Sequence, residues 1–244
     1  MQVMIAGIRS RRECMPTQAE PYLAAIFDVE GTLVDCVPLQ LESWRAALAA
    51  AGHTFSLAEL QSYSGMDGTW MLDQLLPEES ADTRQQLVKH QGELYKAEYL
   101  DRVQPFPAVR DLFVTLKQQG VALGIATSCQ PDELHAYDRL IHVLDLVDAI
   151  ACGDMVKHGK PDPALFSSCV RRLAETHPGR AIAIGDTPYD ARAAKLAGIQ
   201  AAGVLTGGFP RATLLESGCG SVFAQVREVS TLWGLPSKPR VQLS

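Results

Sequence analysis

The sequence lacks both an excess of positive charge and any long apolar run. Its 244 residues include 22 Lys and Arg against 28 Asp and Glu, which gives a formal net charge of -6 at pH 7. A membrane-spanning helix needs about 18 or more consecutive apolar residues, and an acidic chain repels nucleic acid and anionic lipid surfaces. We therefore expect no membrane and no nucleic acid as partner, and we expect a small molecule instead.

Cysteine is scarce and scattered, and the sequence has no signal-peptide pattern. The six cysteines form no Cys-x-x-Cys pair, which disfavours a zinc site or a disulfide framework. The charged patch Arg9-Ser10-Arg11-Arg12 is followed by neither an apolar segment nor a small-residue cleavage site. These features predict a protein of the reducing cytoplasm.

Short apolar runs, each the length of a buried strand, recur along the chain. They lie at residues 22–27, 121–126, 147–151 and 181–184, with a weaker one at 199–205. Between them, helical patterns begin at Asp162-Pro163 and at Thr187-Pro188 and stop at glycines such as Gly120 and Gly198. Alternating buried strands and amphipathic helices predict an α/β fold with a doubly wound parallel sheet.

One long region breaks this alternation. From residue 39 to 102 no strand-like run appears, whereas Leu41, Trp44 and Leu48 share one helical face that ends at Gly52. We therefore predict a core of residues 23–38 and 103–235 with a helical insertion, the cap, at 39–102. Residues 1–22 are expected to be a weakly ordered leader and residues 236–244 a tail.

Polar residues follow the predicted strands at the point where each strand ends. Asp28, Thr127 and Asp186 take these positions, and Lys160 lies in a loop that leads into a helix. Carboxylate oxygens suit Mg²⁺, and a lysine can offset concentrated negative charge. Phosphoryl transfer depends mainly on positioning and electrostatic stabilisation. An aspartate can itself attack a phosphoryl group, so the set predicts metal-assisted chemistry on a phosphate.

The ordered motifs resemble a known family. The segments Asp-Val-Glu-Gly-Thr at 28–32, Thr127-Ser128, Lys160 and Gly-Asp-Thr-Pro-Tyr-Asp at 185–190 look like the four motifs of the haloacid dehalogenase superfamily. The match spans residues 24–209 and points to the branch with a helical cap that contains phosphoglycolate phosphatases and phosphomutases. The resemblance implies a Rossmann-like core, a cap and Mg²⁺-dependent hydrolysis of a small phosphate ester.

The resemblance also assigns catalytic roles to individual residues. Asp28 would be the nucleophile that forms an aspartyl-phosphate, and Glu30 would be the acid and base. Thr127 would bind the phosphate through its hydroxyl group, together with Ser128. Lys160 would bind the phosphate and balance its charge.

A metal site is implied beside these groups. Asp28, Asp186 and the backbone carbonyl of Glu30 would hold Mg²⁺. Asp190 would support Lys160 or the metal without being a direct metal ligand. Taken alone, Asp190 could instead be a residue that merely favours the positive end of its helix.

Residue 30 departs from the family pattern. Most phosphatases of the family have Asp there, and the extra methylene group of Glu30 displaces the carboxyl group, a change that can cost roughly 10²-fold in rate. Glu30 could act on a differently bound substrate, act slowly, or mark a site that mainly binds a phosphometabolite. Relatives with dehalogenase chemistry carry an aromatic residue at this position. Phosphonatases carry Ala and use a cap lysine, and Lys89 and Lys96 fall in the insertion.

Several alternatives remain open at this point. A phosphomutase would differ from a hydrolase mainly in excluding water. The glycine-rich segment 64–69 could reach the substrate or be an ordinary turn, and the face carrying Trp44 is expected to serve packing. The chain could be a monomer or a homodimer.

Overall fold

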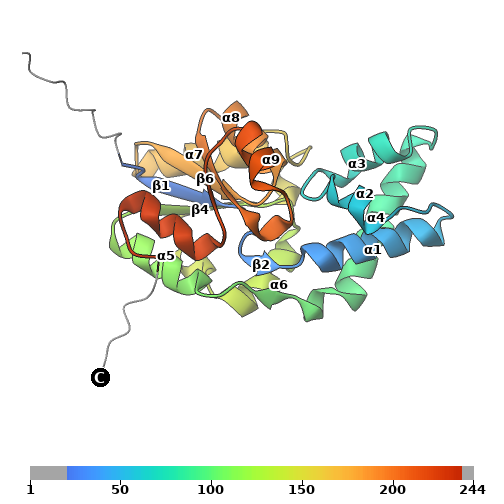
Figure 1. Cartoon of the computed structure of the whole chain (residues 1–244), viewed down its shortest axis with the longest axis horizontal. Coiled ribbons are helices and arrows are strands. Elements are labelled where there is room, and N and C mark those ends of the chain that lie inside the picture. Colours follow the sequence, from blue (N-terminus) through green and yellow to red (C-terminus); the bar gives the residue numbers. More distant parts are fainter. Residues whose placement is uncertain (1–20, 238–244) are drawn as a thin grey trace, which may run out of the picture.

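The computed structural model describes residues 21–237, so most of the predicted leader and tail lies outside the described residues. Within this range no helix is both long and apolar enough to cross a membrane. The described chain forms a parallel sheet covered by helices, with a group of helices set to one side (Figure 1).

The central sheet has six parallel strands in the order β5-β4-β1-β6-β7-β8. The strands are β1 (Ala24–Phe27), β4 (Ala122–Ala126), β5 (Ala149–Ala151), β6 (Ala181–Gly185), β7 (Gln200–Val204) and β8 (Cys219–Phe223). Numbered by their order in the chain, they lie 3-2-1-4-5-6, which is the doubly wound Rossmann order. The predicted fold class is confirmed, and the order reverses between β1 and β6.

Five of these strands lie within or next to the predicted apolar runs, and the sixth was not predicted. Strand β8 contains Gly220, and only Cys219 and Val222 in it are buried. Its pairing with β7 also shifts register between Ala201 and Ala202. A half-exposed edge strand gives no continuous apolar run, so its sequence pattern is weak.

Strand β1 is buried on both faces because its alternating side chains enter two different apolar clusters. Phe27 lies in one cluster and packs against Phe113, with ring centroids 4.7 Å apart. Ile26 lies in the other cluster.

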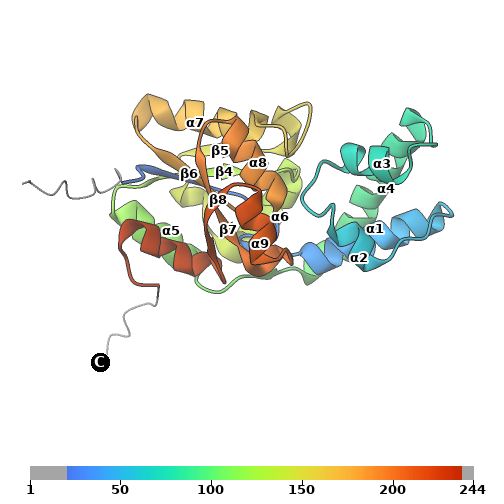
Figure 2. The same cartoon turned by 45° about the horizontal axis from the view of Figure 1, so that its top comes forward.

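Helices cover both faces of the sheet (Figures 1 and 2). The first cluster is closed by α5 (Val109–Gln118), α6 (Pro131–Ile141) and the 3₁₀ helix η5 (Val226–Trp233). The second is closed by α7 (Ala164–Thr176), α8 (Pro188–Leu196) and α9 (Arg211–Glu216). Short 3₁₀ turns complete the core: η2 (Leu144–Leu146), η3 (Gly153–Met155) and η4 (Leu205–Gly207).

The helices set to one side come from the predicted insertion. They are α1 (Val37–Ala50), α2 (Leu57–Gln61), α3 (Gly68–Leu75) and α4 (Ala81–Glu98), followed by the 3₁₀ turn η1 (Leu100–Arg102). They share an apolar cluster in which Leu48, Leu60 and Leu72 are fully buried. We propose on these grounds that the chain divides into core and cap as predicted. Helix α1 begins at Val37, two residues before the predicted start of the insertion at residue 39, because Pro38 is compatible with the first turn of a helix.

A short ribbon joins the insertion to the core. Strand β2 (Val34–Asp35) precedes the insertion, strand β3 (Gln104–Pro105) follows it, and the two pair in antiparallel fashion. Both connections between core and insertion therefore leave from one place, close to the end of β1.

Candidate functional site

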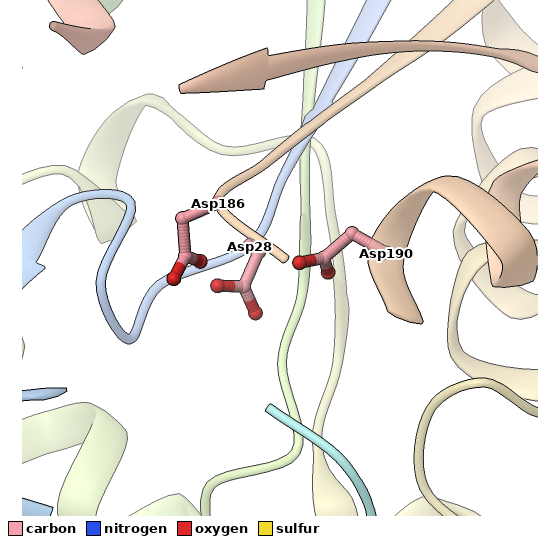
Figure 3. Close-up of side chains that lie close together, drawn as sticks. All are labelled: Asp28, Asp186 and Asp190. Carbon is pink, nitrogen blue, oxygen red and sulfur yellow. The ribbon is translucent and has the colours of Figure 1, made fainter. Parts of the chain in front are cut away.

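Three carboxylates meet at the carboxyl end of the sheet, where the strand order reverses. Asp28 follows β1, Asp186 follows β6, and Asp190 lies in the first turn of α8. All three are buried, and each offers an oxygen within 4.8 Å of the others. Figure 3 shows the three side chains converging from their separate elements. Ligands of doubly wound sheets bind at this reversal point.

Lys160 supplies the positive charge beside these carboxylates. It lies in the loop before α7, is only 2% exposed, and forms ion pairs with Asp28 and with Asp190, the latter at 2.7 Å. Burial alone lowers the pKa of Lys160, but the neighbouring Asp190 and Asp28 outweigh burial and raise this pKa above its usual value. Lys160 is therefore a permanently charged group inside the site.

The carboxylates are incompletely satisfied by the protein. The Thr32 hydroxyl lies 2.9 Å from Asp186 Oδ1 and 3.2 Å from Asp28 Oδ2, so it can donate to only one of them at a time. Asp186 Oδ2 is buried with no hydrogen-bond partner. Burial raises the pKa of Asp28 to about 6, and burial together with the charge of Asp28 raises the pKa of Asp186 well above its usual value.

This donor set fits a divalent cation. Mg²⁺ prefers a small number of hard oxygen ligands and keeps some of its water. The unpartnered oxygen of Asp186, next to the oxygens of Asp28, provides such ligands in a place where buried negative charge needs compensation.

Glycine is required where the chain closes around Asp186. A Cβ atom at Gly31 or at Gly207 would collide with Asp186 Oδ2, and Gly31 also has a φ of +79°. Only glycine lets the backbone approach the Asp186 carboxyl group this closely, and the close approach fixes the position of the carboxyl group.

Asp190 has both of the roles considered for it. Its Oδ2 accepts hydrogen bonds from the backbone N–H of Thr187 at 3.1 Å and from the Thr187 hydroxyl at 2.6 Å. Thr187 Oγ1 in turn accepts from the Asp190 backbone N–H at 3.2 Å, which completes a capping box at the start of α8. The cap holds the carboxyl group so that Oδ1 faces Lys160.

The Glu30 carboxyl group does not belong to the cluster around Asp186. Its Oε1 accepts hydrogen bonds from Gln40 Nε2 and from the Tyr137 hydroxyl, the latter at 3.3 Å, and Tyr137 is itself bonded to the Tyr95 hydroxyl at 2.8 Å. Burial, followed by the charges of Glu133 and Asp28, raises the pKa of Glu30 to about 8.

Two hydroxyl residues follow β4, and one of them, Ser128, lines the cavity with the carboxylates. Thr127 is fully buried, and its Oγ1 accepts from the Cys129 backbone N–H at 3.2 Å. Ser128 Oγ is buried without a hydrogen-bond partner. Ser128 lines a cavity of about 30 Å³ together with Asp28 and Lys160. A buried hydroxyl left without a partner at such a cavity can bind an incoming oxygen.

The insertion closes over this cavity through the segment between α2 and α3. Asp67 Oδ2 accepts from the Gly159 backbone N–H at 2.8 Å, and the Asp67 backbone N–H donates to the Lys160 carbonyl at 2.9 Å. Ser64 and Gly65 line the cavity. The predicted glycine-rich segment 64–69 thus reaches the site.

A second group of bonds joins the insertion to the core nearby. The side chain of Gln61 donates to the Gly207 carbonyl at 2.8 Å, and the Tyr189 hydroxyl donates to the Ser62 carbonyl at 2.6 Å. The insertion therefore contacts two core loops of the site, the loop that carries Lys160 and the loop in which Gly207 lies against Asp186.

Six of the seven residues predicted for the site line one cavity: Asp28, Glu30, Ser128, Lys160, Asp186 and Asp190. Thr127 precedes Ser128 and is fully buried, but it does not line this cavity. The structure adds other residues to the predicted ones. The added residues position the predicted ones and come from distant segments: Thr32, Gln40, Asp67 and Tyr137. Thr32 belongs to the first motif and could have been found there. Asp67 belongs to the glycine-rich segment 64–69, whereas Gln40 and Tyr137 lie in no motif.

The two insertion lysines do not reach the site. Lys89 is exposed on α4 and faces Glu93 at 3.7 Å, and Lys96 pairs with Asp132 at 3.1 Å on the surface. Neither lines the cavity beside Asp28. The phosphonatase alternative, which needs a cap lysine at the reacting centre, therefore has no support in the structure.

Comparison with known proteins defines the class of protein. A family model described as haloacid dehalogenase-like hydrolase matches residues 25–204, so the chain belongs to this family. The predicted resemblance and the expectation that the chain is a hydrolytic enzyme are confirmed.

Individual relatives resemble the chain over most of its length. A fructose-1-phosphate phosphatase from Escherichia coli is 29% identical over 188 residues, which covers 76% of this chain and 97% of that protein. A phosphoglycolate phosphatase from Cereibacter sphaeroides is 28% identical over 197 residues, covering 78% and 88%. The crystal structure of a hydrolase from Pseudomonas syringae has a TM-score of 0.78 at 26% identity, covering 85% and 96%.

Replacing Asp67 tests the contact between the insertion and the Lys160 loop. In Asp67→Ala the Gly159 N–H loses its carboxylate acceptor, a bond worth about 1.5–3 kcal/mol. We expect the Gly159 amide to exchange its hydrogen roughly 10- to 100-fold faster in hydrogen–deuterium exchange. The control is Asp73→Ala, which removes a carboxylate on α3 that pairs with Arg84 on α4. Equal exchange at Gly159 in both variants would contradict the contact.

Proposed function

We propose that the protein is a phosphatase that hydrolyses a small phosphate monoester through an aspartyl-phosphate on Asp28, with Mg²⁺ as cofactor. The observation that carries the proposal is the buried group of Asp28, Lys160 and Asp186 at the reversal point of the sheet. Relatives named as phosphatases of fructose 1-phosphate and of phosphoglycolate support the same reaction class.

The phosphoryl group would lie in the small cavity next to Asp28. Ser128 Oγ lines this cavity without a partner and can donate to the phosphoryl oxygens, and the Lys160 ammonium group offsets their charge. The Thr127 hydroxyl would bind these oxygens as well, as the family resemblance implies. Asp28, Asp186 and the Glu30 backbone carbonyl would hold Mg²⁺, which when bound neutralises negative charge on the phosphoryl oxygens. A carboxylate oxygen of Asp28 then attacks phosphorus, and the bond to the leaving oxygen breaks.

Glu30 would handle the protons of both steps. A pKa of about 8 keeps its carboxyl group protonated at neutral pH, so it can donate a proton to the leaving oxygen. The resulting carboxylate then takes a proton from the water that attacks phosphorus, and Asp28 is released with inorganic phosphate as product. Gln40 and Tyr137 hold the carboxyl group in place, so the longer side chain is built into the site.

The proposal is tested by phosphate release from an aryl phosphate, with and without Mg²⁺. We expect release to require Mg²⁺ and to fall by at least about 10³-fold in Asp28→Asn, because the nucleophile is lost. Asp35→Asn, a change of the same kind at an exposed residue nearby, should retain activity. Absence of release from a broad panel of phosphate esters, or full activity of Asp28→Asn, would refute the proposal.

Shortening Glu30 tests whether the site is built around glutamate. In Glu30→Asp the carboxyl group loses its contacts with Gln40 and Tyr137, and we expect turnover to fall by roughly 10- to 100-fold. Glu30→Gln should preserve the contacts and lose turnover, since an amide is no proton donor of comparable acidity. Steady-state kinetics on one substrate distinguish the cases. A rise in turnover in Glu30→Asp would mean that Glu30 is merely a misplaced aspartate.

A further inference from the structure

The two oxygens of the Glu30 carboxyl group have different surroundings. Oε1 accepts hydrogen bonds from Gln40 Nε2 and from the Tyr137 hydroxyl. Within residues 21–237 no hydrogen bond reaches Oε2, and Glu30 lines the cavity beside Asp28. An oxygen that already accepts two hydrogen bonds leaves the carboxyl proton to the other oxygen. Oε2 is therefore the oxygen that would exchange a proton with the substrate.

The Tyr137 hydroxyl depends on a second tyrosine. A hydroxyl group has one hydrogen, and Tyr137 donates it to Glu30 Oε1 at 3.3 Å. The hydrogen in the 2.8 Å contact between the two tyrosine hydroxyls therefore comes from Tyr95. The three groups form a chain with one direction, in which Tyr95 donates to Tyr137 and Tyr137 donates to Glu30. Hydrogen bonds in such a chain polarise and strengthen one another.

Both tyrosines are almost completely buried. Tyr95 is 2% exposed, Tyr137 is 0% exposed, and both belong to the apolar cluster that α5 and α6 close. In these surroundings a hydroxyl group that lost its partner could not turn to bulk water instead. The two hydroxyl groups are therefore held in a single arrangement, with the Tyr137 hydroxyl against Glu30.

Tyr95 brings the insertion into this chain of hydrogen bonds. It lies on α4, whereas Tyr137 lies on the core helix α6. One turn earlier on the same face of α4, Gln91 Nε2 donates to Ser43 Oγ at 2.7 Å, and Ser43 Oγ donates to the Gln40 carbonyl at 2.8 Å. One face of α4 thus supports both side chains that hold the carboxyl group of the proposed acid.

We propose that Tyr95 of the insertion is a positioning residue, which acts through Tyr137 to fix Glu30 with Oε2 toward the leaving oxygen of the substrate. This inference rests on the proposed phosphatase function. As the bond between phosphorus and the leaving oxygen breaks, the O–H bond of the Glu30 carboxyl group breaks too, and its proton passes from Oε2 to the leaving oxygen. Direct contact with the substrate is the rival role, because Tyr95 also borders a cavity of about 160 Å³ between insertion and core.

Two aryl phosphates with different leaving groups test the proposal. The 4-nitrophenolate ion leaves with little help from an acid, whereas phenolate, the stronger base, needs the proton of Glu30. The specificity constant kcat/KM is measured for both esters in the presence of Mg²⁺. In Tyr95→Phe we expect it to fall roughly 5- to 10-fold for phenyl phosphate and less than about 2-fold for 4-nitrophenyl phosphate. Equal falls for both esters would overturn the proposal.

A double variant separates action through Tyr137 from the rival role. Tyr137→Phe should change the ratio of the two specificity constants at least as much as Tyr95→Phe does. Because Tyr95 acts only through Tyr137, adding Tyr95→Phe to Tyr137→Phe should change the ratio no further. A further change in the double variant would show that Tyr95 acts by another route, such as direct contact with the substrate, and would overturn the proposal.

Tyr99→Phe is the matched control. The Tyr99 ring stacks on the Tyr95 ring with centroids 6.5 Å apart. In the described part of the chain, no hydrogen bond joins its hydroxyl to Tyr95 or Tyr137. The ratio should therefore stay unchanged, and a change equal to that in Tyr95→Phe would overturn the proposal. Absence of hydrolysis of both esters by the unmodified protein would instead refute the proposed function, on which the inference rests.

Discussion

The ion pairs of buried Lys160 with Asp28 and Asp190 are the interaction on which the site depends. Burying an ionised group without a partner is very costly, so buried charges are paired or bind metal. One ammonium group compensates two of the three carboxylates, and Asp186 keeps an oxygen without a partner. Burial raises the pKa values of Asp28 and Asp186, and the neighbouring carboxylates add to this effect. A divalent cation is the natural complement of the negative charge that Lys160 leaves uncompensated.

The same loops that carry these charges also hold the insertion. Asp67 bonds to the backbone on both sides of the Gly159–Lys160 peptide, and Gln61 bonds to Gly207, whose lack of a side chain makes room for Asp186. The insertion thus contributes Ser64 and Gly65 to the wall of the cavity beside Asp28. In the proposed function, the insertion would face the part of the substrate that differs from one phosphate ester to another, and the core would face the phosphoryl group.

The sequence was sufficient for the parts of the structure that are set by local patterns. Continuous apolar runs predicted β1, and glycines and prolines marked the helix ends, whereas β8 was missed because an edge strand is half exposed. The motif residues Asp28, Thr127 and Asp186 are predictable because each directly follows an apolar run. The partners of Glu30 could not be predicted, because Gln40 in α1 and Tyr137 in α6 lie 10 and 107 positions away and meet it only in the folded chain.

The central claim is that the Asp28 carboxylate receives the phosphoryl group. It is tested most directly by stopping the reaction with acid during turnover of a phosphate ester in the presence of Mg²⁺ and mapping the phosphorylated residue by peptide mass spectrometry. We expect a phosphoryl group on the peptide that contains Asp28, and none on that peptide in Asp28→Asn. Phosphorylation at another residue, or turnover with no phosphorylated peptide at any time, would contradict it.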